Sequence, residues 1–317
     1  SIRKVIQKSF KRDLLLYILL RKHHINFLSH SDYLWKGKAI PAMPWIPDFQ
    51  HLHLPHLFSQ QERVKRNQGY LSHVKYGDCV LLSSYAAQKD LQAFAGSVEH
   101  KSKVLQFAAC LAIDIRWPLK DELKEKYNLD RPWFHMPNQF WEHKNHLLVI
   151  EALRIAKQRG ETLLVVATGN KYDERNSKYY SSIMKKIETY GLKNDFLCPG
   201  IVPYEEMLGL MRYSMAVINP SRFEGWSTIA EEARAIGKAT LLSDIKVHQE
   251  QSPPRSRFFN VDDADELAAL MIQVKQVYNS TEEEQFFNDA VAGLQSRQAE
   301  FFNRYKNIVL EIMDADS

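Results

Sequence analysis

The feature that most constrains the fold is a regular alternation of short apolar runs and helical stretches after residue 131. Apolar runs such as "TLLVVATG", "MAVINPS" and "KATLLSD" alternate with longer amphipathic stretches such as "HKNHLLVIEALRIAKQRG". A strand inside a parallel sheet is covered on both faces and is therefore apolar at nearly every position. The pattern predicts the α/β class, with a doubly wound parallel sheet that has helices on both sides.

The first part of the chain shows the same alternation in a weaker form, with "DCVLLSS" and "SKVLQFA" as strands and a long helix from Ser59 to Lys75. We predict two Rossmann-like domains facing a cleft, because ligands of open α/β sheets bind beyond the carboxyl ends of the strands. The predicted parts are an N-terminal domain that is incomplete at its start (1–115), a connector (116–131), a C-terminal domain (132–298) and a C-terminal helix that packs back on the N-terminal domain (299–317).

The composition is that of a globular protein, with 45% hydrophobic and 25% charged residues among 317. The apolar run from Leu14 to Leu20 is far shorter than the roughly 20 residues that span a bilayer, and no small-residue cleavage site accompanies it. Cys79, Cys110 and Cys198 are odd in number and widely spaced, which is typical of reduced thiols. These features predict a cytoplasmic protein.

Positive charge is concentrated at the start of the chain. Residues 1–50 carry nine Lys or Arg against three acidic residues, a balance of 9 − 3 = +6, whereas the whole chain has a net charge of +4. This region is either a solvated helix face or a peripheral contact with an anionic membrane at the inner face. No nucleic-acid-binding motif accompanies the charge, and no G-x-G-x-x-G follows a strand, which argues against a dehydrogenase.

The segment "PSRFEGWSTIAEEARAIG" places two carboxylates at the end of a predicted strand. Thr228 is predicted to cap the following helix and to form a capping box with Glu231. Glu224 then lies in the loop before the helix, and Glu232 lies one turn inside it. Gly225 allows close backbone approach, and the free N–H groups of a helix start favour phosphate. This combination suits a sugar linked to a nucleotide diphosphate.

Together with "MPNQFWEHKNHLLVIEAL", "TGNKYD" and "SDIKVHQE", the segment resembles the retaining glycosyltransferases of GT-B architecture, family four in the usual sequence classification. Their signature is two glutamates with seven residues between them. The resemblance extends from about Ile40 to Leu270. It implies transfer of a sugar from a nucleotide diphosphate sugar to an acceptor, with retention at the anomeric carbon and without a metal or other cofactor.

The resemblance also assigns roles to residues of the C-terminal domain. Glu224 would contact the donor sugar, Glu232 the ribose and Lys144 the diphosphate, while Asn138 stands where the family commonly has an arginine. The loops "TGNKYD" and "GIVPYEE" would contact the base. The predicted donor-binding residues are Asn138, Lys144, Gly169, Val202, Glu224, Gly225, Trp226, Ser227, Thr228 and Glu232.

In the N-terminal domain, "IPDFQHLHLPHLFS" resembles the loop where many relatives have His-Asp. Asp48 matches the aspartate, Pro47 stands in the histidine position, and His51 or His53 would replace the histidine. The pattern H-x-H-x-x-H, which ends at His56, is not predicted to bind a metal, because a proline interrupts any helix there and no acid or cysteine completes a site. The predicted catalytic residues are Glu224, Lys144, Asp48 and His51.

The first strand and glycine-rich loop of such enzymes have no counterpart before "INFLS", so the first βα units are expected to be missing. Two functions remain open at this point. One is an active enzyme that uses a UDP- or GDP-linked donor and transfers the sugar to a glycan or lipid-linked acceptor in polysaccharide biosynthesis. The motif "NQFWEHKNH" resembles that of enzymes with mannose-type donors. The other is a nucleotide-sugar-binding subunit that has lost catalysis, which Asn138 and Pro47 favour.

Overall fold

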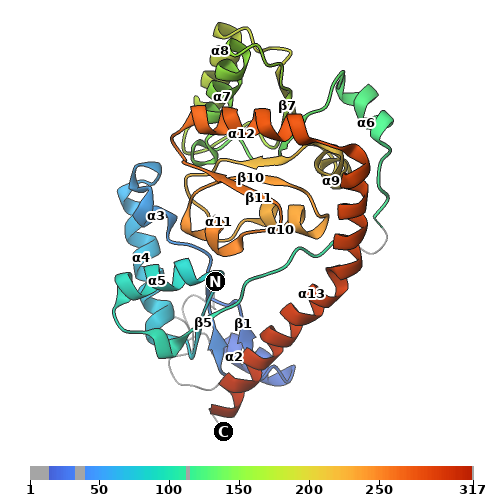
Figure 1. Ribbon diagram of the computed structural model, residues 1–317. Helices are drawn as coiled ribbons and strands as arrows, with labels where there is room; N and C mark the ends of the chain where they lie inside the picture. Colours follow the sequence, from blue (N-terminus) through green and yellow to red (C-terminus); the bar gives the residue numbers. More distant parts are fainter. Residues whose placement is uncertain (1–13, 33–39, 112–114, 316–317) are drawn as a thin grey trace. The chain divides into compact units, whose positions relative to one another are not determined.

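The computed structural model describes residues 14–32, 40–111 and 115–315. It divides into two compact units. Unit 1 comprises Ser1–Phe107 and Ala299–Ser317, and unit 2 comprises Ala108–Gln298. The chain therefore passes from unit 1 to unit 2 and returns to unit 1 through its last helix, α13 (Ser280–Ala315; Figure 1).

In the described part of unit 2, six strands form one sheet in the order β11-β10-β9-β6-β7-β8, and every neighbouring pair is parallel. The strands are β6 (Phe134–Met136), β7 (Val165–Thr168), β8 (Phe196–Gly200), β9 (Val217–Asn219), β10 (Thr240–Ser243) and β11 (Ser256–Phe259). All residues of β6, β7, β9 and β10 are buried, as the continuous apolar runs predict. The predicted α/β fold with a parallel sheet is confirmed.

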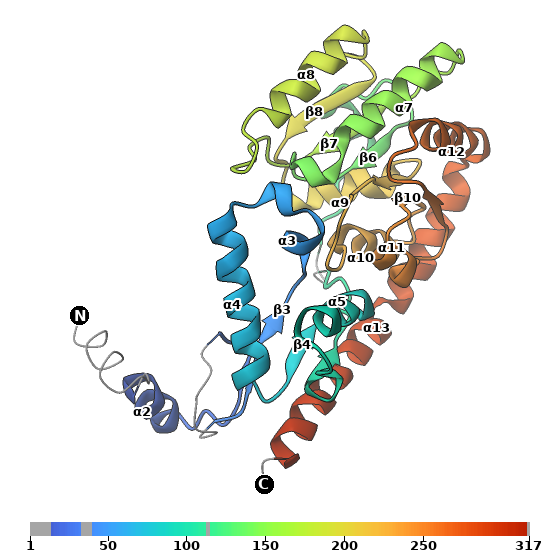
Figure 2. The same cartoon turned by 90° about the vertical axis from the view of Figure 1, so that its left-hand side faces the viewer.

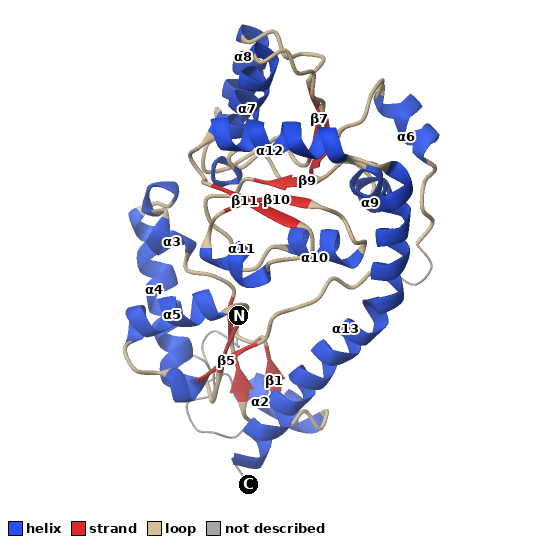
Figure 3. Ribbon diagram, viewed as in Figure 1, coloured by secondary structure: helices blue, strands red, loops and turns tan. Residues whose placement is uncertain are grey.

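Helices cover both faces of this sheet (Figure 3). They are α6 (Lys120–Tyr127), the 3₁₀ turn η3 (Glu142–Lys144), α7 (His146–Gln158), α8 (Tyr179–Thr189), α9 (Tyr204–Tyr213), α10 (Thr228–Ala235), α11 (Lys246–Gln251) and α12 (Ala264–Val277). One core joins the sheet to α7, α8 and α12, and a second joins it to α9, α10 and the first part of α13. Burial on both faces explains why the strands have no polar side.

The strand order contains a topological switch point. From β6 the chain moves outward to β7 and β8, then returns to β9 on the other side of β6 and moves outward to β10 and β11. Helices that follow β6 and β9 therefore lie on opposite faces, and the loops after these strands separate beyond their carboxyl ends. Ligands of open α/β sheets bind at this point. The two loops carry Lys144 and Glu224.

Unit 1 contains two small parallel sheets. β1 (Leu28–Ser29) pairs with β2 (Ala42–Met43), and β3 (Trp45–Ile46), β4 (Val80–Leu82) and β5 (Ser102–Val104) form the second sheet in that order. Its helices and 3₁₀ turns are α2 (Leu14–Lys22), α3 (Gln50–His53), η1 (Pro55–Leu57), α4 (Gln60–Tyr76), α5 (Tyr85–Ala95) and η2 (Glu99–Lys101; Figure 2). Ile308 and Ile312 of α13 join Met43 and Cys79 in one of its cores.

Two local features differ from the sequence-based expectation. The helix expected from His143 begins three residues later, because η3 ends at Lys144 and the next residue, Asn145, has a left-handed conformation (φ 56°) before α7. Residues of the expected connector form α6 and belong to unit 2. Among the described helices, none combines the length and the apolar character that crossing a membrane requires.

Candidate functional site

The site is built around an ion pair between Lys144 and Glu224. The Lys144 Nζ donates to Glu224 Oε1 at 2.7 Å, and the two side chains are only 12% and 10% exposed. Burial alone would raise the pKa of Glu224, but the charge of Lys144 and the hydrogen bond from its ammonium group lower it to about 2. At neutral pH the pair is therefore a carboxylate and an ammonium group held largely out of water.

The loops after β6 and β9 hold the two charges together. Lys144 ends η3, which follows β6, and Glu224 lies in the loop between β9 and α10. The backbone N–H of Arg222 donates to the carbonyl oxygen of His143 at 2.8 Å, so the two loops are also joined through their main chains. The ion pair is thus placed by backbone contacts at the switch point of the sheet.

The N-terminus of α10 lies directly after the Glu224 loop. Ser227 is its N-cap, and its Oγ accepts a hydrogen bond from the N–H of Ala230 at 3.2 Å. The predicted cap at Thr228 is wrong, because Thr228 is already the first helical residue. The predicted capping box is also wrong, since Glu231 is buried and its Oε1 accepts a hydrogen bond from Gln251. Both corrections leave a helix start that follows the Glu224 loop, and the N–H groups of Thr228 and Ile229 in its first turn have no partner within the helix.

Glu232 lies inside α10 and meets the start of α9. The hydroxyl of Tyr204 donates to Glu232 Oε1 at 3.1 Å. Burial raises the pKa of Glu232 to about 7, although the hydrogen bond from Tyr204 lowers it in part. The carboxyl group is therefore partly protonated at neutral pH. Tyr204 is 45% exposed and follows Val202, which is half-buried in the loop after β8.

Asn138 and Gly169 bring the loops after β6 and β7 into close contact. Asn138 is 1% exposed, and its Nδ2 donates to Asn219 Oδ1 at 3.3 Å. Gly169 has a φ of +147°, and a Cβ there would lie 2.4 Å from the Asn138 carbonyl oxygen, so no other residue fits. Within the described residues, the Oδ1 of Asn138 has no hydrogen-bond partner.

The structure thus gathers the predicted donor-binding residues at the carboxyl ends of β6–β9, all within unit 2. Gly225 and Trp226 are half-buried in the Glu224 loop. The predicted catalytic residues Asp48 and His51 belong to unit 1.

In unit 1, His51 is fully buried, and its Nε2 donates to Asn67 Oδ1 at 2.8 Å. Burial lowers the pKa of His51 below its ordinary value. Asp48 Oδ1 accepts a hydrogen bond from the N–H of Gln50 at 2.8 Å. His53 Nε2 lies 2.9 Å from Asp90 Oδ2. Among the described residues, no group of three or more His, Cys, Asp or Glu could hold a metal ion.

Two residues of the site were not predicted from the sequence to have a functional role. Tyr204 binds Glu232 from 28 positions earlier in the chain, and its only sequence signal is its place in "GIVPYEE". His248 is fully buried, and burial lowers its pKa although the nearby charge of Glu224 opposes this in part. Its only signal is its place shortly after the strand "KATLLSD".

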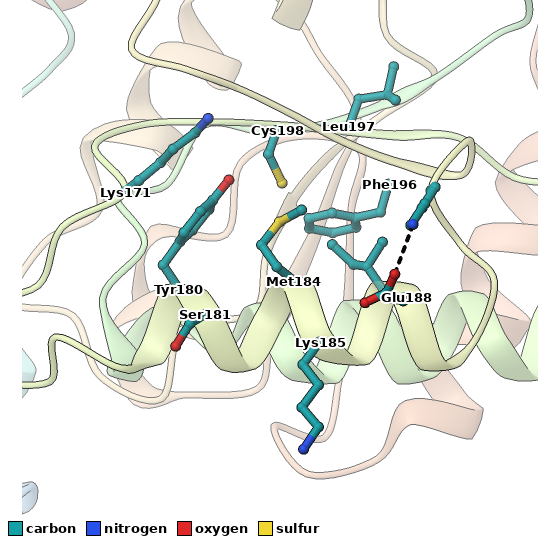
Figure 4. A pocket seen from close by; sticks show the side chains of 11 residues that line it. Lys171, Tyr180, Ser181, Met184, Lys185, Glu188, Phe196, Leu197 and Cys198 are labelled. Atoms are coloured by element: carbon teal, nitrogen blue, oxygen red, sulfur yellow. Dashed lines mark hydrogen bonds and ion pairs between the residues drawn. The ribbon is translucent and has the colours of Figure 1, made fainter.

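A separate hollow of about 750 Å³ lies along α8 and the edge strand β8 (Figure 4). The ammonium group of Lys193 is bound to Glu188 at 3.0 Å, and Lys185 extends away from the hollow. Lys171 lies 5.4 Å from the centre of the Tyr180 ring. The hollow is lined by residues of the sheet edge, without any of the charged residues of the switch point, and it is not part of the site.

Residues 120–285 match the sequence profile of the family described as "Glycosyl transferases group 1". The chain belongs to this family. No curated protein matches the chain. The fold is also that of solved GT-B glycosyltransferases, and these relationships confirm the predicted GT-B type. This family member is therefore a glycosyltransferase.

Three solved structures illustrate the similarity. A glycosyltransferase from Rickettsia africae is 15% identical, with a TM-score of 0.71, over 94% of this chain and 80% of its own. Anabaena HepE in complex with UDP and glucose is 14% identical, with a TM-score of 0.71, over 93% and 81%. Sucrose-phosphate synthase from Thermosynechococcus elongatus is 16% identical, with a TM-score of 0.66, over 86% and 69%. At these identities the similarity concerns the fold alone.

Proposed function

We propose that this glycosyltransferase binds a nucleotide diphosphate sugar in unit 2 and transfers the sugar to a hydroxyl group, with retention of configuration and without a metal. The observation that carries the proposal is the buried Lys144–Glu224 pair at the switch point, next to the N-terminus of α10. A positive charge and free backbone N–H groups suit a diphosphate, and an adjacent ionised carboxylate suits sugar hydroxyl groups.

Lys144 and the start of α10 would stabilise the departing diphosphate. Negative charge grows on the diphosphate as its bond to the sugar breaks, and donors already fixed in a site with little water stabilise it most. Lys144 is held by Glu224 before the donor arrives, so it needs little reorganisation. Asn138 adds a polar side chain but no charge at the place where relatives commonly have an arginine.

Glu224 and Glu232 would bind the two sugars of the donor. Glu224 is ionised, so it accepts hydrogen bonds from hydroxyl groups of the transferred sugar. Glu232, eight residues later, would accept hydrogen bonds from the ribose when it is deprotonated. We favour a UDP-linked donor over a GDP-linked one, because Anabaena HepE has been solved with UDP and with UDP-glucose. A mannose-type donor remains a prediction of the sequence alone.

The proposed reaction breaks the bond between the anomeric carbon and the diphosphate oxygen and forms a bond from that carbon to the acceptor oxygen. The acceptor attacks on the face that the diphosphate leaves, and its proton passes to the departing phosphate oxygen. Glycans and lipid-linked glycans are the proposed acceptors. Asp48 and His51 of unit 1 are the proposed acceptor-side residues.

Calorimetric titration with UDP, GDP, ADP and TDP tests the donor site. We expect one nucleotide to bind, and Lys144→Ala and Glu232→Gln each to weaken its binding about tenfold or more. Lys193→Ala is the matched control, because it removes a lysine of the same unit that is also paired with a glutamate. If the wild-type protein is folded and binds none of the four nucleotides, the donor-site proposal is wrong.

The second candidate function is a nucleotide-sugar-binding subunit without turnover, and the uncharged Asn138 is the observation that favours it. The two candidates differ in one measurement. An active enzyme releases the nucleoside diphosphate from its donor in the presence of an acceptor, and the release depends on Glu224. A subunit binds the donor equally well but releases no nucleotide with any acceptor.

A peripheral membrane contact through α2 is also proposed. Leu15, Ile18 and Leu19 of α2 are 44%, 54% and 51% exposed, and Arg21 and Lys22 follow in its last turn. Exposed apolar residues next to positive charge suit the headgroup region of an anionic membrane. This contact would bring the enzyme close to a lipid-linked acceptor.

A further inference from the structure

A group of buried polar side chains lies beneath the Glu224 loop. Burying a hydroxyl, amide or imidazole group is costly unless it finds a hydrogen-bond partner, so such a network fixes the orientation of each member. Each side chain is at most 2% exposed. The members are Asn138, Asn219, Ser221, Ser227, Ser243 and His248.

Asn219 connects the two ends of the loop that carries Glu224. Its Oδ1 accepts a hydrogen bond from Ser221 Oγ at 2.7 Å. Its Nδ2 donates to Ser227 Oγ at 2.9 Å. Ser221 and Ser227 lie immediately before and after residues 222–226. A single amide at the end of β9 therefore closes the loop and holds the N-cap of α10.

His248 fixes which way this amide points. Its Nδ1 donates to the carbonyl oxygen of Ser243 at 2.9 Å, so the Nε2 of the neutral ring is an acceptor. The Nε2 lies 3.2 Å from Asn219 Nδ2, which gives the second N–H of the amide its partner. Burial lowers the pKa of His248 and keeps the ring neutral. The hydroxyl of Ser243 donates to the carbonyl oxygen of Ser221 at 2.6 Å and holds the start of the loop a second time.

We propose that Asn219 and His248 are positioning residues: they hold the Glu224 loop and the start of α10 in the geometry that binds the diphosphate sugar. The proposal rests on the proposed function of unit 2. Neither residue needs to touch the donor, because both act through Ser221 and Ser227. Loss of the Asn219 amide would leave His248 Nε2 without a donor and Ser227 Oγ with the Ala230 N–H alone. The side chain that ties the two ends of the loop to each other would then be gone.

Three variants test this proposal. Asn219→Leu has nearly the same size and removes all of the amide hydrogen bonds, whereas Asn219→Asp keeps the acceptor for Ser221 and removes the donors. His248→Phe removes the acceptor that orients the amide. Ser214→Ala is the matched control, because Ser214 is a fully buried polar residue of unit 2 whose hydroxyl donates only to the Met211 carbonyl.

The first readout needs no ligand. We expect amide hydrogen exchange of residues 222–227 to become about tenfold faster in Asn219→Leu and His248→Phe, with unchanged exchange in α12. Trypsin should also cleave after Arg222 in these variants and not in Ser214→Ala. Normal protection of the loop in both Asn219→Leu and His248→Phe would overturn the proposal, whether or not the wild-type protein binds a nucleotide.

The second readout is UDP affinity, measured well below the unfolding temperature of each variant. We expect about tenfold weaker binding for Asn219→Leu and Asn219→Asp, and wild-type binding for Ser214→Ala. If wild-type protein binds UDP and the variants bind it equally well, the positioning role is wrong and the proposed function stands. If wild-type protein binds no nucleotide, the proposed function is wrong, and the exchange experiment alone decides whether the network holds the loop.

Discussion

Removing Lys144 should destabilise the protein because it leaves the carboxylate of Glu224 buried without its partner. The environment lowers the pKa of Glu224 from 4.5 to about 2, even though burial opposes the change. At about 1.4 kcal/mol per pKa unit, this difference corresponds to about 3 kcal/mol of stability at neutral pH. Breaking a buried ion pair by removing one partner costs about 3–5 kcal/mol in general. We therefore expect Lys144→Ala to lower the free energy of unfolding at pH 7 by about 3 kcal/mol.

The stability that the ionised Glu224 contributes changes with pH in a definite direction. A carboxyl group with a lowered pKa contributes stability that is present above the unfolded-state pKa and is lost as the pH falls toward the folded-state pKa. For Glu224 the loss occurs between pH 4.5 and about pH 2. In Lys144→Ala the main lowering influence is gone and burial raises the pKa of Glu224 instead. The stability difference between wild type and Lys144→Ala should therefore shrink as the pH falls below neutral.

A double-mutant cycle isolates the interaction. Unfolding in urea at pH 7, followed by circular dichroism, is measured for Lys144→Ala, Glu224→Gln and the double variant. We expect Glu224→Gln to be less harmful than Lys144→Ala, and a coupling energy of about 2 kcal/mol or more. The pair Lys193–Glu188 is the control, since its side chains are 69% and 70% exposed and its coupling should be about 0.5 kcal/mol or less. Equal coupling energies for the two pairs would refute the argument from burial.

Three further outcomes are expected. Because burial raises the pKa of Glu232 to about 7, affinity for UDP-glucose, whose diphosphate does not titrate in this range, should fall as the pH drops below about 7. Calorimetry across pH should show this fall in wild type and a lower, nearly constant affinity in Glu232→Gln. Gly169→Ala should destabilise the protein by about 2 kcal/mol or more in thermal melts, because its Cβ would lie 2.4 Å from a backbone oxygen. Gly69 has open space around it in helix α4, so Gly69→Ala should stabilise the protein slightly in the same assay. Ile18→Asp should abolish co-sedimentation with phosphatidylglycerol vesicles. Leu71 is similarly exposed on α4, and Leu71→Asp should leave co-sedimentation unchanged. Equal sedimentation of both variants, or binding to phosphatidylcholine vesicles alone, would contradict the contact through α2.

The sheet of unit 2 could be predicted from the sequence because its signal is local. Strands covered on both faces must be apolar throughout, and β7 and β10 show this within a few residues. The positions of Glu224 and Lys144 relative to their strands follow from the same pattern. Their direct contact does not, because it depends on β9 lying beside β6, which the chain reaches only after passing through β7 and β8.

The features that the sequence did not predict depend on contacts between distant residues. Ser227 and Thr228 are both good N-caps by residue type. The side chain of Gln251, 24 positions later, accepts a hydrogen bond from the N–H of Ser227 and favours Ser227 as the cap. The neutral state of His248 likewise depends on its complete burial, and the raised pKa of Glu232 depends on the burial of that side chain.

In the proposed donor site, the ion pair would allow a single lysine to bind a doubly charged group beside an acid. A diphosphate placed next to an ionised Glu224 would be repelled, and this repulsion is strong where water is scarce. Lys144 lies against that carboxylate and offsets its charge. Asn138 adds no charge, so the remaining stabilisation in the proposed site would come from the backbone N–H groups at the start of α10, which Ser227 and Asn219 hold in place. The affinity for the diphosphate should therefore depend strongly on the geometry of the Glu224 loop.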